Sequence, residues 1–264
     1  MSNPFFLNRL ASEPHALAFA GQSTPWPVAL ADETANPVLD EQLHAHVRQA
    51  QNLLYPVSAD LLATTGRPVD LFGFTPNPAK LGAAANASAS VPGIALAQLG
   101  ALIDAEELGY NPAEAKPVAV LGHSQGILAV HMVQSIREAG SVEAAAPSID
   151  EILAIASLIG IAGTRQARQL GLAARHGDAT PMLSVKDITR AQVDALVERV
   201  DGARGPIAVA VTNSATHYVL SGYPEDLAAF GVEVAKEHKR QAKLREEKVR
   251  GGRVFDPTLE YLDV

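Results

Sequence analysis

Apolar residues in the first half of the chain follow two patterns, short uninterrupted runs and longer runs at helical spacing. The short runs Ala16–Ala20 and Val118–Leu121 predict strands, and a glycine follows each of them. Helical spacing predicts four helices, at Val38–Leu54, Val91–Leu108, Ile127–Ile136 and Ile152–Leu170. The second helix is expected to have Pro92 in its first turn, where proline is well tolerated. Such alternation is typical of an open parallel sheet with covering helices.

The second half of the chain changes to the order strand, helix, strand, strand, helix, strand. The predicted segments are Met182–Val185, Thr189–Val200, Ile207–Val211, Tyr218–Ser221, Pro224–Arg250 and Leu259–Val264. This βαββαβ order is that of a ferredoxin-like unit, a two-layer module that can be inserted into a larger core. The sequence therefore predicts an α/β protein with two parts.

Composition agrees with a globular α/β protein, since 47% of the 264 residues are hydrophobic and 19% are charged. The absence of cysteine excludes a disulfide framework and a thiol nucleophile. A net charge of −8 argues against nucleic acid as the main partner. No apolar run approaches a membrane span, and the first ten residues lack the apolar segment of a signal peptide. We therefore expect a cytoplasmic protein without membrane contact.

The chemistry-bearing motif lies between the strand at residues 118–121 and the helix that follows it. It reads Gly122, His123, Ser124, Gln125, Gly126. A tight strand-to-helix turn holds its central serine in a sparsely allowed backbone conformation, and the flanking segments approach too closely for side chains at the two glycines. This nucleophile elbow predicts Ser124 as a nucleophile and the backbone N–H of Gln125 as an oxyanion donor.

The general base is harder to identify, because a serine nucleophile needs a histidine within hydrogen-bond reach. We expect His123 to pack beneath the turn, since neighbouring side chains diverge on a sharp elbow. Three other histidines are predicted on polar, solvated helix faces: His44, His46 and His238. His176 and His217, in predicted turns, stay open as the base. The eight histidines lack metal-ligand spacing and no carboxylate cluster accompanies them, so no metal site is predicted.

Four parts of the sequence are together more specific than the elbow alone. They are Ala18–Trp26, Ser90–Leu99, Leu121–Leu128, and the pair Pro181–Val185 with Val211–Pro224. In these segments the chain resembles the acyltransferase domain at the N-terminus of type I fatty acid synthases, of the bacterial single-chain or fungal β-subunit kind. The resemblance implies an α/β-hydrolase-like core at residues 1–178 and an inserted ferredoxin-like subdomain at 179–264.

The resemblance also implies an activity, the transfer of acetyl groups from acetyl-CoA to the acyl carrier protein through an acyl-serine intermediate. Acetyl-CoA is then a substrate and the phosphopantetheine of the carrier is the acceptor, with no permanently bound cofactor. The implied partners are the carrier protein and the other synthase domains of a longer polypeptide, which assembles as a homo-oligomer.

Further site residues follow from the resemblance. Gln22 matches the second side of the oxyanion hole, although Ser23 stands where the family usually has glycine and would be strained if that position needs a positive φ. Gln98 matches a glutamine that lines the pocket in relatives, with a helix-packing or surface role as the alternative, and His123 is assigned to the same lining.

Acyl selectivity is expected to depend on Ile159. Malonyl transferases carry an arginine at the matching position, which pairs with the malonyl carboxylate. An apolar side chain cannot compensate a desolvated carboxylate, so an uncharged acyl group such as acetyl should be preferred. A plain core role for Ile159 is the alternative. Arg165, a rival carboxylate binder, lies six residues further along the same predicted helix and should point elsewhere.

In the resembled family, the catalytic histidine follows directly after the last strand of the ferredoxin-like subdomain. That strand matches residues 256–264, so we expect the histidine and the asparagine that orients it beyond Val264. The 264 residues are then a fragment that should expose apolar surface where further core strands pack.

Two other classes of function stay open. One is a serine esterase, with Ser124 completed by His176 or His217 and an aspartate such as Asp178. The other is a non-catalytic segment of a large assembly. A further feature is the row of basic residues between Lys236 and Arg250, which could attract CoA phosphates or an acidic carrier protein, or could be a solvated helix face.

Overall fold

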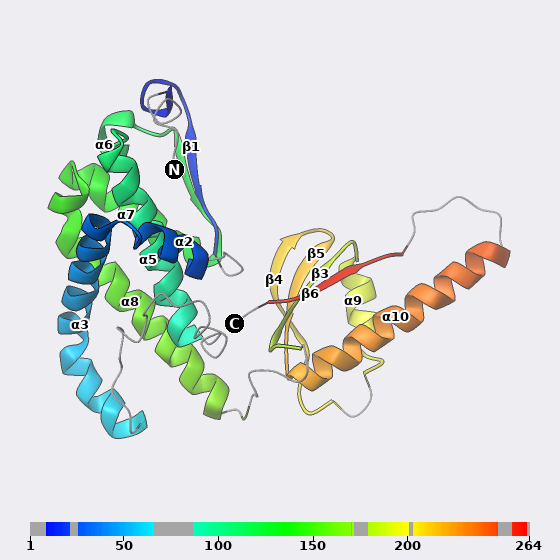
Figure 1. The fold of residues 1–264 in the computed structure, drawn as a ribbon. Coiled ribbons are helices and arrows are strands. Elements are labelled where there is room, and N and C mark those ends of the chain that lie inside the picture. The colour runs from blue at the N-terminus through cyan, green and yellow to red at the C-terminus, as the bar shows by residue number, and fades with distance from the viewer. Residues whose placement is uncertain are drawn as a thin grey trace. The chain divides into compact units, whose positions relative to one another are not determined.

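The computed structural model describes residues 9–21, 26–65, 87–169, 171, 179–200, 203–247 and 255–262. The chain divides into two compact units, Met1–Thr164 and Arg165–Val264 (Figure 1). The division expected after residue 178 falls within the second of these units.

The first unit combines a parallel pair of short strands with helices. β1 (Ala16–Phe19) pairs with β2 (Ala119–Gly122), and Phe19 lies opposite Gly122 at the ends of the two strands. The helical elements are α2 (Trp26–Glu33), α3 (Pro37–Thr65), α5 (Ala87–Glu107), α6 (Pro112–Ala115), η1 (Ser124–Gly126), α7 (Ile127–Ala139) and α8 (Val142–Gln169). The parallel register confirms the predicted sheet type.

Helix α5 begins four residues before the predicted start, at Ala87, so Pro92 lies inside the helix rather than in its first turn. A first-turn N–H group of a helix has no acceptor within the helix itself. In α5 the N–H of Ser88 finds one in another element, because it donates to Oγ1 of Thr164, 3.0 Å away. This contact is long-range and is not visible in local sequence spacing.

Helix α8 also begins earlier than predicted, at Val142, and includes Pro147. Its first turn is capped from two directions. Ser141 Oγ accepts a hydrogen bond from the N–H of Ala144 (3.1 Å), and Oε2 of Glu106 on α5 accepts one from the N–H of Val142 (3.1 Å). These acceptors satisfy donors that a helix cannot satisfy itself, so the helix extends past the proline.

One core holds the helices of the first unit together. It is formed by buried apolar residues of α2, α3, α5, α7 and α8, among them Leu43, Ile94, Leu99, Met132 and Ile149. At Gly93 the backbone of α5 comes so close to the indole of Trp26 that a Cβ would lie 2.5 Å from Cζ3. The glycine therefore sets the closeness of α2 and α5.

Within the described ranges, one segment, Val142–Gln166 of α8, has the length and apolar composition that a membrane-spanning helix needs. The sequence pattern did not predict an apolar helix of this length, because proline, serine and charged residues interrupt its apolar positions. Ile149, Leu153 and Ala156 of this segment are buried in the core of the first unit. The apolar face of α8 is thus used in packing within the unit.

The second unit has the predicted βαββαβ order. Its elements are β3 (Met182–Lys186), α9 (Arg190–Val197), β4 (Ala208–Ser214), β5 (His217–Ser221), α10 (Pro224–Glu247) and β6 (Thr258–Tyr261). The four strands form an antiparallel sheet in the order β4-β5-β3-β6. This is the ferredoxin-like arrangement, so the predicted α/β fold with a βαββαβ subdomain is confirmed.

Alternation along the strands of the second unit decides which face of the sheet is buried. Leu183 and Val185 on β3 share a face with Tyr218 and Leu220 on β5, and all four are buried with apolar residues of α9 and α10. Helix α9 starts with a capping box, in which Thr189 and Gln192 exchange side-chain to backbone hydrogen bonds. The local signals in this unit agree with its tertiary packing.

A buried carboxyl group is an unusual feature of the first unit. Glu33, at the end of α2, lies so close to Cα of Gly100 on α5 that any side chain at position 100 would overlap it. Its Oε2 atom is buried without a hydrogen-bond partner. Burial, together with the negative charges of Asp104 and Asp32, raises the pKa of Glu33 from 4.5 to about 8. The folded protein therefore favours the protonated form of this residue.

We expect Glu33→Gln to change how stability depends on pH. The folded state binds the Glu33 proton more tightly than the unfolded state, so this group lowers the free energy of unfolding as pH rises from 4.5 to about 8. Glutamine cannot ionise, so the melting temperature of the variant minus that of the parent should increase across this window. Thermal unfolding followed by circular dichroism at several pH values measures the difference, with Glu41→Gln on the exposed face of α3 as the control. A constant difference across the window would contradict the assignment.

Candidate active site

The strand-to-helix turn has the bend that the sequence predicted. β2 ends at Gly122, a single helical turn of the 3-10 type covers Ser124–Gly126, and α7 begins at Ile127. The φ angle of Ser124 is +54°, in the left-handed region that L-residues rarely occupy. Ser124 is exposed. The turn thus holds a serine in a strained backbone conformation at the surface of its unit.

Two glycines make this turn possible. A Cβ at Gly122 would lie 2.5 Å from the carbonyl oxygen of Gly126. A Cβ at Gly126 would lie 2.8 Å from the carbonyl carbon of Phe19 and 3.0 Å from the oxygen of Ala20. All of these neighbours are backbone atoms, which cannot give way as a flexible side chain can. Both positions therefore require glycine for steric reasons, as predicted.

A third glycine, Gly21, also touches the turn. The sequence predicted a glycine after the strand but not this contact. A Cβ at Gly21 would lie 2.6 Å from the oxygen of His123, 2.7 Å from Cβ of Ser124 and 3.0 Å from the N atom of Gln125. The end of β1 thus passes directly against the nucleophile turn. A glycine following the strand that pairs with the elbow strand is the signal that could have identified this contact.

Gln22, predicted to complete the oxyanion hole, lies outside the described residues together with Ser23. Gln125 is described, and it lies in the first turn after the elbow, where backbone N–H groups lack acceptors within the helix. Its side-chain Oε1 atom is buried without a hydrogen-bond partner. The assignment of both glutamines to an oxyanion hole stays a prediction.

Gln98 lies on α5 and reaches the end of β1. Its Nε2 atom donates to the carbonyl oxygen of Ala20 at 2.6 Å, its side chain is largely buried, and its Oε1 atom has no partner. This geometry ties α5 to the strand end that passes the turn. A hydrogen bond in a buried setting fixes the backbone more firmly than an exposed one does. Its predicted place in a substrate pocket stays a prediction.

The prediction that His123 packs beneath the turn is wrong. His123 is exposed, and its backbone makes the local contacts: its N–H donates to the oxygen of Phe19 and its carbonyl accepts from the N–H of Gly126, both at 2.9 Å. The close approach of Gly122, Gly126 and Phe19 leaves no room beneath the turn for an imidazole. The assignment of His123 to a pocket lining stays a prediction.

Five of the other histidines in the described part of the chain form side-chain contacts of their own. These contacts are His15 with Tyr110, His44 with Asp40, His46 with Asp150, His217 with Ser184, and His238 with Asp256. His217, an open choice for the base of an esterase, has its Nε2 atom 3.0 Å from Oγ of Ser184 within the second unit. His176 and Asp178 lie outside the described residues.

Ile159, predicted to set acyl selectivity, lies on α8 and is 50% exposed, so it is not a fully buried core residue. Ile155, one helical turn earlier, is exposed to nearly the same extent, at 49%. Arg165, further along the helix, is also exposed. These exposures leave room for a larger side chain at either isoleucine position.

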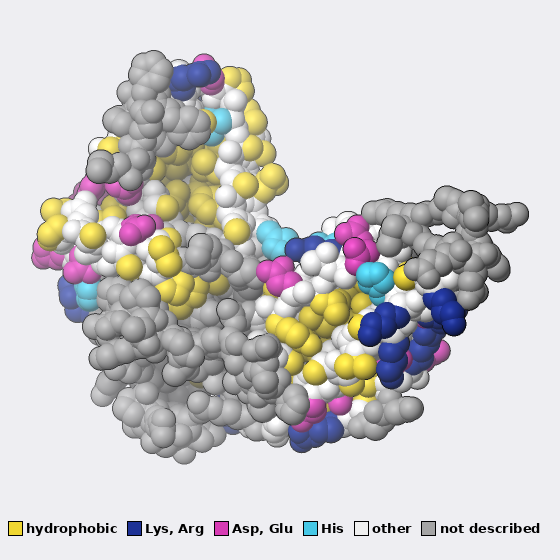
Figure 2. Space-filling model, turned by 45° about the vertical axis from the view of Figure 1, so that its right-hand side comes forward, with side chains coloured by type: hydrophobic (Ala, Val, Ile, Leu, Met, Phe, Trp, Pro, Cys, Tyr) yellow, Lys and Arg dark blue, Asp and Glu magenta, His cyan; other side chains and the backbone are white. Residues whose placement is uncertain are grey.

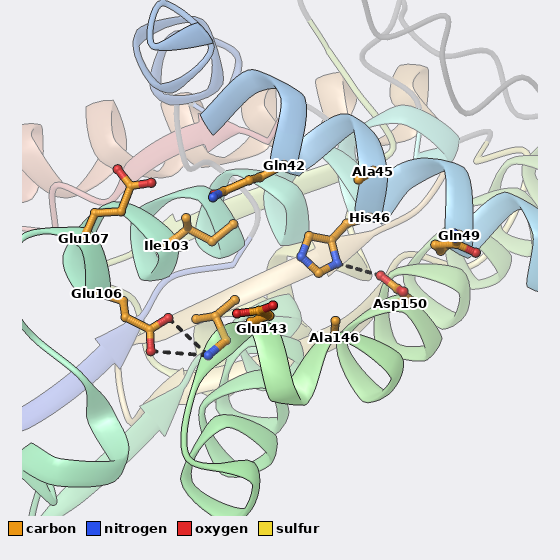
Figure 3. Close-up of a pocket in the computed structure, with 11 residues that line it drawn as sticks. Gln42, Ala45, His46, Gln49, Ile103, Glu106, Glu107, Glu143, Ala146 and Asp150 are labelled. Atoms are coloured by element: carbon orange, nitrogen blue, oxygen red, sulfur yellow. Dashed lines mark hydrogen bonds and ion pairs between the residues drawn. The ribbon is translucent and has the colours of Figure 1, made fainter. Parts of the chain in front are cut away.

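A cavity of about 480 Å³ lies between α3, α5 and α8 (Figure 3). Inside it, Nδ1 of His46 lies 2.6 Å from Oδ1 of Asp150, and both side chains are nearly buried. The prediction that His46 is solvated is wrong, because its partner comes from a helix distant in sequence. Burial raises the pKa of Asp150, and the hydrogen bond and positive charge of His46 oppose this.

The walls of this cavity carry carboxylates of Glu106, Glu107 and Glu143 in addition to Asp150 (Figure 3). Both carboxylate oxygens of Glu106 already accept a hydrogen bond from the N–H of Val142. Ser124 is not among the residues that line the cavity. Within the described ranges, no group of three or more histidine, cysteine or acidic side chains could hold a metal ion. The cavity therefore lies between three helices and is separate from the turn. The candidate active site is the exposed turn at Ser124.

Sequence comparison relates this chain to fatty acid synthases. Residues 181–261 match the family described as the fatty acid synthase central AT domain. The chain is 31% identical over 128 residues to the fatty acid synthase β subunit hexB of Dothistroma septosporum. That alignment covers 44% of this chain and 7% of the β subunit, so the chain spans a small part of the length of this relative.

Solved structures similar to the chain include two malonyl CoA-acyl carrier protein transacylases. The enzyme from Clostridium perfringens is 16% identical with a TM-score of 0.49, and the similarity covers 96% of this chain and 61% of that one. The enzyme from Coxiella burnetii is 17% identical with a TM-score of 0.48, covering 85% of this chain and 58% of that one. The sequence of the chain is thus similar to fatty acid synthases, and residues 181–261 are similar to their central AT domain.

Proposed function

We propose that the chain transfers acetyl groups from acetyl-CoA to the phosphopantetheine thiol of an acyl carrier protein, by way of an acyl-serine at Ser124. One observation carries the proposal: an exposed serine at φ +54° lies in a strand-to-helix turn whose two glycines cannot bear side chains. This geometry supports a nucleophile, because the strain and the glycines are otherwise unnecessary in a simple turn.

The proposed reaction has two symmetrical steps. Oγ of Ser124 attacks the thioester carbonyl, a base takes the hydroxyl proton, and the carbon–sulfur bond breaks as CoA leaves with a proton. The thiol of the carrier then attacks the acyl-serine and releases the serine hydroxyl. The N–H of Gln125, and Gln22 on the opposite side, would stabilise the oxyanion of each tetrahedral intermediate.

The general base is proposed to be a histidine in a longer polypeptide of which these residues form one part. The small share of the β subunit that the alignment covers supports this proposal. So does the two-stranded sheet of the first unit, because parallel sheets are normally wider and buried on both faces. Val118, just before β2, and Leu121 on β2 are 73% and 60% exposed, and such side chains are of the kind that further core elements cover. No permanently bound cofactor is needed for these steps.

Substrate preference provides the test of this function. We expect the longer polypeptide to transfer radiolabelled acetyl groups faster than malonyl groups to a pantetheine acceptor, because Ile159 offers no positive charge to a malonyl carboxylate. We expect Ile159→Arg to reverse the preference by at least about tenfold, the effect of a charge-assisted hydrogen bond. Initial rates in a competition between the two CoA esters measure this ratio.

A matched control is available for this substitution. Ile155→Arg places the same charge on the same helix at nearly the same exposure, one turn away. It should leave the acetyl to malonyl ratio unchanged. Equal effects of the two arginines would mean that general charge, and not position 159, determines selectivity.

A further inference from the structure

Helix α10 carries a row of four exposed basic residues along one side. Lys236, Lys239, Arg240 and Lys243, here called the basic stripe, are spaced by three and four residues and so share one helix face. Figure 2 shows Lys and Arg side chains gathered at the right of the view, on the second unit. The chain as a whole is acidic, with a net charge of −8, so this face differs in sign from the average surface.

Two acidic residues of the same helix, Glu233 and Glu237, lie beneath the stripe. The side chains of Glu233 and Glu237 are only 16% and 8% exposed, whereas those of their partners Lys236 and Arg240 are 67% and 59% exposed. Arg199, at the end of α9, also pairs with Glu237 at 2.9 Å. Buried carboxylates thus hold basic side chains whose outer surfaces face the solvent.

These contacts persist over the physiological pH range. The hydrogen bond from Arg240 is the largest of the causes that lower the pKa of Glu237 to about 2, so the carboxylate stays ionised. Lys239 and Lys243 form no ion pair with another described residue, and their charges remain available to a partner. The stripe is therefore a positive surface on which two ammonium groups have no ion pair among the described residues.

The length of the stripe indicates what kind of anion it fits. Val232, 54% exposed, lies on the same face one turn before Lys236. From Val232 to Lys243 the helix rises about 17 Å at 1.5 Å per residue, which corresponds to three turns of a facing helix. The phosphates of one nucleotide would occupy only part of it and would not use an exposed valine. A second copy of this acidic chain is disfavoured by net charge.

We propose that the basic stripe docks an acidic protein helix that presents carboxylates at spacings of three and four residues. Under the proposed function, on which this assignment of the partner rests, that helix belongs to the acyl carrier protein. Charge contacts of this kind mainly raise the association rate and make binding dependent on salt.

Direct binding tests this proposal without requiring catalysis. The probe is the fluorescently labelled holo carrier domain of the fatty acid synthase from the same organism, titrated with the 264-residue chain at low and at physiological salt. We expect Lys239→Glu with Lys243→Glu to weaken binding by about tenfold or more at low salt and to flatten the salt dependence. The matched control is Arg48→Glu with Arg137→Glu, which reverses two exposed charges of the first unit and should change affinity less than twofold.

The outcomes separate docking from chemistry. Equal losses in the two double variants, or no loss in the stripe variant, would overturn the docking proposal even if Ser124 proves to be acylated. Weaker binding of free CoA with unchanged binding of the carrier would also overturn it, in favour of a nucleotide site. Circular dichroism verifies the fold, and Lys239→Gln with Lys243→Gln should show an intermediate effect if charge is the cause.

Discussion

Replacing Ser124 by alanine should abolish the acyl-enzyme adduct and reduce acyl transfer by at least about a thousandfold, the usual effect of removing a nucleophile. The reason is that no other group in the turn can form the covalent intermediate. The measurement is mass spectrometry after brief exposure of the longer polypeptide to acetyl-CoA, together with the rate of transfer to pantetheine. The parent should gain the mass of one acetyl group on the peptide that contains Ser124.

Ser135 provides the control for this experiment. It is a half-buried serine on α7, and its hydroxyl donates to the oxygen of His131 at 3.0 Å in an ordinary helix contact. Ser135→Ala should keep the adduct and the transfer rate. An adduct that persists in the Ser124→Ala variant would show that the nucleophile is another residue.

The second large effect is expected from Gly126→Ala. A methyl group at this position would lie 2.8 Å from the carbonyl carbon of Phe19 and 3.0 Å from the oxygen of Ala20. The turn and the end of β1 must then separate. We expect a loss of about 3 kcal/mol in the free energy of unfolding, the upper end for overpacking, and the loss of the acyl adduct. Denaturant unfolding and adduct mass spectrometry on the same preparations measure both effects.

Gly140 allows steric and conformational causes to be separated. Its φ is +96°, and a Cβ there would meet nothing within 4 Å, whereas Gly126 has an ordinary φ of −58° and no space. Gly140→Ala should therefore cost only about 1–2 kcal/mol of backbone strain and leave the adduct intact. If both variants lose stability equally and keep the adduct, the contact with β1 is not important for the site.

Local patterns were sufficient to predict the turn and the second unit. The elbow could be read from sequence because its glycines are required by contacts within one short segment and the strand beside it. The βαββαβ order could be read because strand alternation and the start of α9 at Thr189 are local signals that agree with the packing. Prediction succeeded where the residues that cause a structure are neighbours in sequence.

Contacts between distant segments could not be predicted in the same way. The early start of α8 depends on Glu106 of another helix, the burial of His46 depends on Asp150, and the close approach of Gly21 to the turn depends on strand pairing. None of these partners is indicated by spacing. The roles of Ser124, Gln22, Gln98 and Ile159 in a reaction stay predictions, because they depend on contacts with a bound substrate.

The pairing of β1 with β2 has a consequence for how the protein is made. The described residues between the two strands form helices α2, α3, α5 and α6, and the strand register sets Phe19 against the turn. Joining segments so distant carries a chain-entropy cost that local structures do not have, so such pairings form slowly. During synthesis, the contact between Phe19 and the turn at Ser124 is therefore absent from the nascent chain until β2 has left the ribosome and paired with β1.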